Sequence, residues 1–306
     1  MIQVMGHDHH HGHSHGPPAD NSRLFAIAAA VNIAFVCFEG IAGLVTGSLA
    51  LLADAGHNLS DVLGLLMAWG AAAMAKRAPT GRRTYGLRKG TILASVANAV
   101  LLLVAVGIIV WEAVHRFGQP HPIATEPVMV VAGVGVMINT GTALMFMRAR
   151  KEDLNARGAF LHMAADAAIS LGVVVAALAI ALTGQLWIDP VVSLVIAVVI
   201  VLGTWELLRE SLDLALDAAP KGVDTKAVRG WLETLPGVTE VHDLHVWALS
   251  TTETALTAHL TRPEGGPTDD FLHEACAGLS ERFGIGHATL QLETGGACRL
   301  SPADVV

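Results

Sequence analysis

Six long apolar stretches occupy most of the chain, at about residues 24–46, 49–75, 91–115, 126–147, 158–183 and 187–208. Each is about 20 residues or longer, enough to cross a hydrocarbon core of about 30 Å as a helix. After residue 208 the pattern changes: 224–235 and 268–283 are amphipathic, whereas 239–249, 254–261 and 287–293 alternate like strands. The pattern therefore predicts a membrane all-α bundle of six transmembrane helices followed by a small α+β domain of order αββαβ.

These patterns divide the chain into four parts. We expect a disordered arm at 1–22, a six-helix transmembrane domain at 23–209, a cytoplasmic α+β domain at 210–296 and a short tail at 297–306. The arm contains no apolar run that would support a fold.

The composition agrees with a membrane protein. Apolar residues make up 53% of the chain and charged residues only 15%, with a mean hydropathy of +0.53. Soluble domains are about 25% charged, so a purely soluble protein, a disordered chain and a coiled coil are excluded. The net charge of −8 arises entirely after residue 208. An acidic domain argues against a nucleic-acid partner, because proteins that bind nucleic acid are basic.

Basic residues in the loops predict the orientation. The loop after the second stretch holds six lysines and arginines and that after the fourth holds four, whereas the loops after the first and fifth have none. Because positive loops stay in the cytoplasm, both termini are expected there, in the inner membrane of a cell. The first residues lack the basic region and cleavage site of a signal peptide.

Ionisable residues lie inside two of the apolar stretches. His57 and Asp61 are four residues apart in the second, and His162 and Asp166 repeat this spacing in the fifth. Residues four apart share one helix face. One such pair would fit a helix–helix hydrogen bond equally well. Two matching pairs instead favour four ligands at tetrahedral spacing, which suits Zn²⁺. Asp54 lies near the same face and is a candidate pathway residue.

A transporter must bind a divalent cation and then release it. All four of these ligands titrate, so protons compete with the metal and a proton gradient can drive release. Other polar residues in the apolar stretches line the pathway or form interhelical hydrogen bonds, and the second role is favoured; they are Asn32, Glu39, Asn98 and Asn139. Asp189-Pro190 predicts a helix start with proline in the first position.

The chain opens with an interrupted histidine tract. Such tracts bind metal, and on the cytoplasmic side this one would collect cations weakly for loading; a cloning tag is the alternative. Its histidines are His7, His9, His10, His11, His13 and His15.

Five ordered motifs resemble the cation diffusion facilitator family, in particular its bacterial zinc-efflux branch. The motifs are LADAGHNLSD (52–61), TYGLRKGTILA (84–94), HMAAD (162–166), IDPVVSLVIA (188–197) and VHDLHVWAL (241–249). The resemblance implies a homodimer with a metallochaperone-like cytoplasmic domain. It also implies efflux of Zn²⁺ in exchange for protons by alternating access, with the transport site on His57, Asp61, His162 and Asp166.

The resemblance implies a second metal site in the cytoplasmic domain, formed by His242, His259 and Glu293, where Zn²⁺ would act as a regulatory ligand. Some relatives complete this site with a cysteine pair, of which only Cys298 remains here. A packing role for the two histidines stays open. For His245 and His287 a surface or packing role is favoured.

Other classes of protein fit less well. A membrane metalloenzyme would need an open coordination position and a base, and no H-E-x-x-H motif is present, so we do not expect an enzyme. A channel needs weaker coordination than a four-ligand cage. A sensor would bind metal and move none. Within the transporters, Cd²⁺, Co²⁺ and Ni²⁺ are alternatives to Zn²⁺, since His and Asp bind all of them.

Overall fold

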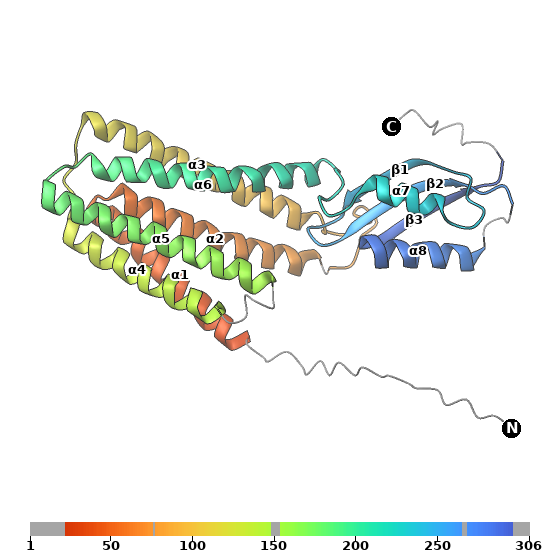
Figure 1. The fold of residues 1–306 in the computed structure, drawn as a ribbon, viewed down its shortest axis with the longest axis horizontal. Coiled ribbons are helices and arrows are strands. Elements are labelled where there is room, and N and C mark those ends of the chain that lie inside the picture. The colour runs from red at the N-terminus through yellow and green to blue at the C-terminus, as the bar shows by residue number, and fades with distance from the viewer. Residues whose placement is uncertain (1–21, 76, 148–153, 265–267, 296–306) are drawn as a thin grey trace, which may run out of the picture.

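The computed structural model describes residues 22–75, 77–147, 154–264 and 268–295. The histidine arm and Cys298 therefore lie outside the described residues. Two lobes follow each other along the long axis, a helical bundle and a smaller α+β domain (Figure 1). The predicted fold class is confirmed, with six long helices before the αββαβ elements.

Six helices make up the bundle. They are α1 (Ser22–Thr46), α2 (Leu49–Ala75), α3 (Gly90–Gly118), α4 (Thr125–Phe146), α5 (Leu154–Thr183) and α6 (Ile188–Ala215). Among the described residues, α3, α4, α6 and the part of α5 from Phe160 onward are long and apolar enough to cross a membrane. Helix α4 packs along α5 and α3 along α6, while α2 contacts both pairs and α1.

Many large apolar side chains on these helices are exposed, including Ile108, Trp111 and Leu202. In water such a surface would be unfavourable, but lipid tails solvate it. A buried cluster centred on Leu51, Val106 and Val173 holds the helices together. The bundle therefore has a packed interior and a lipid-facing exterior.

The second lobe is a three-stranded sheet with two helices. Its elements are α7 (Thr225–Glu233), β1 (Glu240–Ala248), β2 (Thr254–Thr261), α8 (Asp269–Phe283) and β3 (Ile285–Glu293). The sheet order is β1-β2-β3, with β1 antiparallel and β3 parallel to β2. The parallel pair needs a crossover, which α8 supplies. Apolar side chains of both helices and all three strands share one core.

Local signals set the helix ends in this lobe. Asp224 caps α7 by accepting from the backbone N–H of Lys226 and Ala227. Thr268 caps α8 in the same way, and Gly284 ends α8 in the left-handed conformation that glycine adopts without strain. These caps fix where the polypeptide leaves each helix and enters a strand.

The helix start predicted at Asp189-Pro190 is confirmed, but two details of α6 differ from the expectations. The helix continues to Ala215, past the expected end near residue 208, and the charged residues Arg209 and Asp213 of its last turns are exposed. Pro190 is also not its first residue, since α6 begins at Ile188. The carboxylate of Asp189 instead receives hydrogen bonds from the start of α2.

Candidate metal sites

The first candidate site lies between α2 and α5. His57 Nε2 is 3.4 Å from Asp166 Oδ1, and His162 Nε2 is 3.6 Å from Asp166 Oδ2. The two imidazole rings stand edge-on, with centroids 6.1 Å apart. The structure thus brings three of the four predicted transport-site residues together, with both imidazoles beside the carboxylate of Asp166.

Exposure differs sharply among these residues. The Asp166 side chain is 2% exposed, that of His57 is 19% exposed and that of His162 is 41% exposed. The carboxylate is therefore at the closed end of the group, and the imidazole of His162 is at its open end. The fourth predicted residue, Asp61, belongs to α2 one turn beyond His57, but its side chain lies outside the described part of the structure.

A polar seam continues the contact between α2 and α5. Ser170 Oγ donates to Asp54 Oδ2 at 2.7 Å, one turn from the His57–Asp166 contact on each helix. The two helices run antiparallel, so Asp54 and His57 on α2 lie beside Ser170 and Asp166 on α5. Asp54, predicted as a pathway residue, is fully buried in this seam.

Helix α1 adds one further carboxylate beside Asp54. Asn58 Nδ2 lies 3.4 Å from Glu39 Oε2 and 3.5 Å from Asp54 Oδ1. Glu39 is fully buried. The interhelical hydrogen bond that we favoured for Glu39 is thus present, and its partner is the residue next to His57. The sequence alone did not connect Glu39 with Asp54, because α1 and α2 are brought into register only by their packing.

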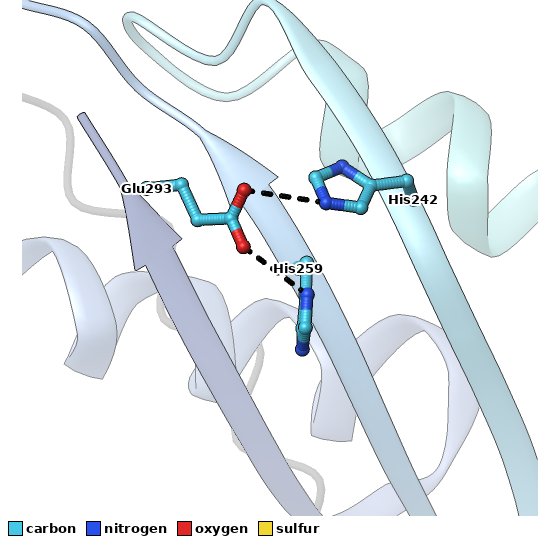
Figure 2. Close-up of side chains that lie close together, drawn as sticks. All are labelled: His242, His259 and Glu293. Carbon is cyan, nitrogen blue, oxygen red and sulfur yellow. Dashed lines mark ion pairs between the residues drawn. The ribbon is translucent and has the colours of Figure 1, made fainter. Parts of the chain in front are cut away.

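The second candidate site crosses the sheet. His242, His259 and Glu293 stand on β1, β2 and β3, and one ligand atom from each lies within 4.8 Å of the others (Figure 2). Glu293 Oε2 is 3.3 Å from His242 Nε2, and Glu293 Oε1 is 3.2 Å from His259 Nδ1.

The donor set of this trio fits a zinc ion. His242 is 3% exposed and Glu293 8% exposed, so these polar groups are largely removed from water. Both ring nitrogens of His242 and Nδ1 of His259 are buried without hydrogen-bond geometry to any partner. Two imidazoles and a carboxylate are ligands that Zn²⁺ uses, and a bound ion would be a partner for one nitrogen of each imidazole.

The strand register explains why these residues meet. His242 pairs directly with His259 across β1 and β2, and His259 pairs with Gln291 of β3, two residues before Glu293. A bulge interrupts β1 between His242 and His245, and within it Asp243 has a positive φ of 48°. The bulge turns the Asp243 side chain back toward β2.

Asp243 is a site residue that the sequence reasoning missed. Its Oδ2 is 3.4 Å from His259 Nε2, and its Oδ1 is 2.9 Å from His245 Nε2. A carboxylate on the outer nitrogen of a metal-ligating imidazole orients the ring and fixes its tautomer. The only available signal was its place in the HDLH segment, and the bulge that turns it toward His259 was not predictable from alternation.

Two other histidines of this lobe make contacts of a different kind. His245 contacts Asp243, and His287 stacks edge-on against Tyr85 of the α2–α3 loop, with ring centroids 5.6 Å apart. For His287 the favoured packing role agrees with this contact.

The two lobes meet at the basic α2–α3 loop and the start of α3. Arg88 forms an ion pair with Glu253 at 3.1 Å, and Lys89 pairs with Asp217 at 2.5 Å. Thr91 Oγ1 accepts from the backbone N–H of Thr251 at 3.1 Å. The basic loop and the α+β domain therefore lie at the same end of the bundle.

The chain matches two family models. Residues 25–214 match the cation efflux transmembrane domain, and residues 220–295 match the cytoplasmic domain of cation efflux proteins. Together they cover both lobes.

Several curated proteins are similar over nearly their whole length. The metal cation efflux system protein CzcD of Cupriavidus metallidurans is 36% identical over 283 residues, covering 92% of this chain and 90% of that protein. The zinc transporter ZitB of Escherichia coli is 35% identical over 291 residues, covering 94% and 93%. A cadmium, cobalt and zinc/H(+)-K(+) antiporter of Bacillus subtilis is 30% identical over 295 residues, covering 95% and 92%.

Proposed function

The chain belongs to the cation diffusion facilitator family of cation efflux transporters, and from this premise we propose that it exports Zn²⁺ from the cytoplasm in exchange for protons. Its relatives are transporters and not enzymes, as expected. The proposal assigns the cation, the counter-ion and the residues that carry them.

One observation carries the proposal: imidazoles from two membrane helices converge on the buried carboxylate of Asp166. Charged and polar groups are unfavourable in lipid and mark ion pathways. With Asp61, the group offers two nitrogens and two carboxylates, a set that Zn²⁺ accepts in tetrahedral geometry. The names of two relatives, a zinc transporter and an antiporter that also exchanges H(+), support the same cargo and counter-ion.

Protons provide the means of release. Imidazole and carboxylate ligands must lose their protons to bind a metal, so each bound cation displaces protons, and protons displace the cation. Exchange at His57, Asp61, His162 and Asp166 therefore couples zinc movement in one direction to proton movement in the other. The antiporter relative also carries cadmium and cobalt by its name, so a broader ion range is the alternative within this proposal.

The orientation proposed is that both termini face the cytoplasm. The basic α2–α3 loop marks the cytoplasmic side by the positive-inside rule. Its ion pairs with Glu253 and Asp217 attach the α+β domain to that same side. His162, the more exposed imidazole, lies toward this end of α5, so zinc would enter from the cytoplasm.

The trio in the α+β domain is proposed as a regulatory zinc site. It lies away from the membrane helices, on three strands of the cytoplasmic domain. A homodimer joined through these domains is part of the proposal. Because each domain is acidic, Zn²⁺ bound there would reduce the repulsion between two copies and draw them together.

Metal uptake into proteoliposomes tests the transport proposal. The wild type and His162→Ala are reconstituted, a pH gradient is imposed, and entry of Zn²⁺, Cd²⁺, Co²⁺ and Mn²⁺ is followed. We expect zinc uptake that follows the gradient in the wild type and falls to the level of empty liposomes in His162→Ala. His115→Ala, which removes an exposed imidazole at the far end of α3, is the matched control and should transport normally.

Three results would contradict parts of the proposal. Zinc flux that ignores the pH gradient would indicate a channel. Bound zinc with no flux of any ion would indicate a sensor. Full transport in His162→Ala would remove the assigned site.

A further inference from the structure

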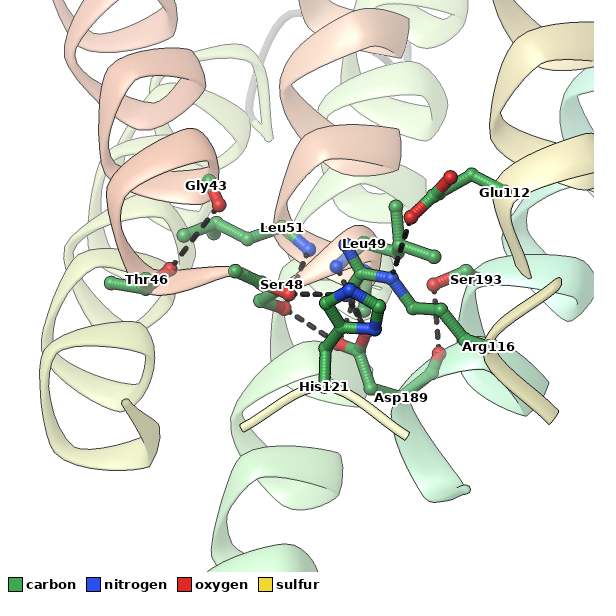
Figure 3. A network of polar contacts seen from close by, with 12 residues as sticks. Gly43, Thr46, Ser48, Leu49, Leu51, Glu112, Arg116, His121, Asp189 and Ser193 are labelled. Atoms are coloured by element: carbon green, nitrogen blue, oxygen red, sulfur yellow. Dashed lines mark hydrogen bonds and ion pairs between the residues drawn. The ribbon is translucent and has the colours of Figure 1, made fainter. Parts of the chain in front are cut away.

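Another buried carboxylate, that of Asp189, lies at the opposite end of the bundle from the cytoplasmic domain. It belongs to the first turn of α6 and is 2% exposed. Its Oδ1 accepts from Ser48 Oγ at 2.6 Å and from the backbone N–H of Ala50 at 3.2 Å, and its Oδ2 accepts from the N–H of Leu49 at 2.8 Å (Figure 3). The first backbone N–H groups of α2 are thus capped by a carboxylate of α6.

This arrangement replaces an ordinary helix cap. The first backbone N–H groups of a helix have no partner within it, and the helix dipole favours a negative charge there. Ser48 supplies one local cap by accepting from the N–H of Leu51 at 3.2 Å. Asp189 satisfies the N–H groups of Leu49 and Ala50, although it lies about 140 positions later in the chain. The cap of α2 is therefore also a bond between two helices.

Helix α3 completes the group. Arg116 Nη1 is 3.8 Å from Asp189 Oδ2, and the same guanidinium donates to the carbonyl oxygen of Gly47 and, through Nε, to Glu112 at 3.1 Å. A guanidinium this close offsets the charge of a buried carboxylate. We call the group formed by Asp189, Ser48, Arg116 and the N–H groups of Leu49 and Ala50 the outer pin.

The outer pin joins α2, α3 and α6, whereas the ligands of the proposed transport site come from α2 and α5. His57 lies eight residues after Leu49, which is about 12 Å along a helix. Because helices are stiff over such lengths, a fixed first turn also fixes the rotation of α2 and the direction in which His57 points. The α2–α5 seam, by contrast, is held by the polar side-chain contacts Asp54–Ser170 and His57–Asp166, of which a cation bound at the proposed transport site would replace the second.

We propose that the outer pin stays closed throughout the transport cycle, and that Asp189 is a positioning residue for the transport site. The outer end of α2 then keeps its contacts with α6 and α3 while the polar contacts between α2 and α5 change. The proposal uses the zinc transport proposed above for one assay only; its second assay does not depend on transport.

Cross-linking tests the proposal directly. The parent protein carries Cys37, Cys276 and Cys298 replaced by Ser, and Ser48→Cys and Asp189→Cys are added singly and together. Losing the carboxylate leaves buried donors unpaired, so we expect Asp189→Cys alone to lower initial zinc uptake by about tenfold. Joining both cysteines with a short bifunctional thiol reagent replaces the pin covalently and should restore at least about a third of the parent rate, since helix position is regained without the charge.

Two outcomes would overturn the pin. A joined double variant that stays inactive, while the reagent leaves the parent active, would mean that this end must open or that the carboxylate acts chemically. Parent-like uptake by Asp189→Cys alone would mean that the pin positions nothing. Loss of folding is detected separately. A folded variant elutes from a size-exclusion column in detergent at the same volume as the parent and still binds zinc at His242, His259 and Glu293.

The second assay measures hydrogen exchange in the parent protein, in which the pin is intact. The backbone N–H groups of Leu49 and Ala50 should exchange equally slowly with or without zinc, because Asp189 accepts from both in every state. Exchange at these two groups that becomes faster in either condition would overturn the pin even if no zinc uptake were found, and a parent that lacks uptake would count against the transport proposal alone.

Discussion

Two histidine–carboxylate clusters in this protein use similar side chains on different scaffolds. His57, His162 and Asp166 come from two helices that touch along a narrow seam, whereas His242, His259 and Glu293 come from adjacent strands tied by backbone hydrogen bonds. Shifting one helix would separate the first set, but separating the second requires breaking the sheet. The first scaffold could therefore release a bound cation by a helix shift, which fits the proposed transport site, whereas the second holds its side chains in place, which fits the proposed regulatory site.

Exposure points to the same difference. In the membrane cluster one imidazole is 41% exposed and the carboxylate 2% exposed, so the group is open at one end. In the cytoplasmic trio the side chains of His242, His259 and Glu293 are 2%, 13% and 8% exposed. The predictions below test this contrast in order of decreasing effect.

Asp166→Ala should have the largest effect. It removes the carboxylate between both imidazoles, and removing one partner of a buried charged pair costs about 3–5 kcal/mol. We expect zinc uptake in proteoliposomes to fall to background, while zinc binding by the cytoplasmic trio is unchanged. Uptake above a tenth of the wild-type rate would place the cargo elsewhere.

Glu293→Gln should affect the other cluster alone. Because outer-shell partners of a metal ligand are worth about 10- to 100-fold in affinity, loss of a ligand itself should weaken zinc binding by at least about 100-fold. Isothermal titration of a His162→Ala background that also lacks residues 1–20 measures this site by itself. The exposed Glu281→Gln of α8 is the control, and equal affinity in the two variants would argue against the trio.

Asp243→Asn should have an intermediate effect on the trio. The amide keeps the shape but loses the charge that holds the outer nitrogen of His259, so zinc affinity should fall by about tenfold. The same titration detects it, with the exposed Asp270→Asn as control. An unchanged affinity would show that the bulge is enough to orient His259.

Ser170→Ala should have a small effect on transport. Interhelical hydrogen bonds in membranes average about 0.6 kcal/mol, or roughly a threefold change. Initial zinc uptake should change by no more than that, in either direction. Thr142→Ala is the control, because the Thr142 hydroxyl donates to the carbonyl oxygen of Ile138 one turn back in its own helix. This variant should leave zinc uptake unchanged. A hundredfold loss in Ser170→Ala would make the seam part of the binding site.

Deletion of residues 1–20 should have the smallest effect. The histidine arm is expected to bind cations weakly and to aid loading, so maximal uptake should remain and only uptake at low zinc should decline. Uptake rates measured across a range of zinc concentrations would separate a change in maximal uptake from a change in uptake at low zinc. Complete loss would make the arm part of the pathway.

Periodicity predicted most of the fold. The six apolar stretches and the αββαβ order needed only hydrophobic spacing, and identical four-residue spacing singled out His57, Asp61, His162 and Asp166. Cross-strand register, which places His242 beside His259, needed the resemblance as well as the alternation.

Long-range polar contacts were beyond such reasoning. Asp189 was interpreted as part of its own helix start, but it caps α2, and nothing within either helix indicates a cap supplied from another. Asp243 was missed for a related reason, because a β-bulge changes which way one side chain points without changing the pattern around it. Glu39 and Asp54 meet only through packing of α1 against α2.

Counting the zinc ions bound per chain tests the central contrast most directly. The chain lacking residues 1–20 is equilibrated with zinc in detergent as the parent, as His162→Ala, as His259→Ala and as the double variant. If the two sites are separate, the parent binds two zinc ions per chain, each single variant binds one, and the double variant binds none. Loss of both ions in either single variant, or an unchanged count in His162→Ala, would contradict a cargo site between α2 and α5 that is distinct from the cytoplasmic trio.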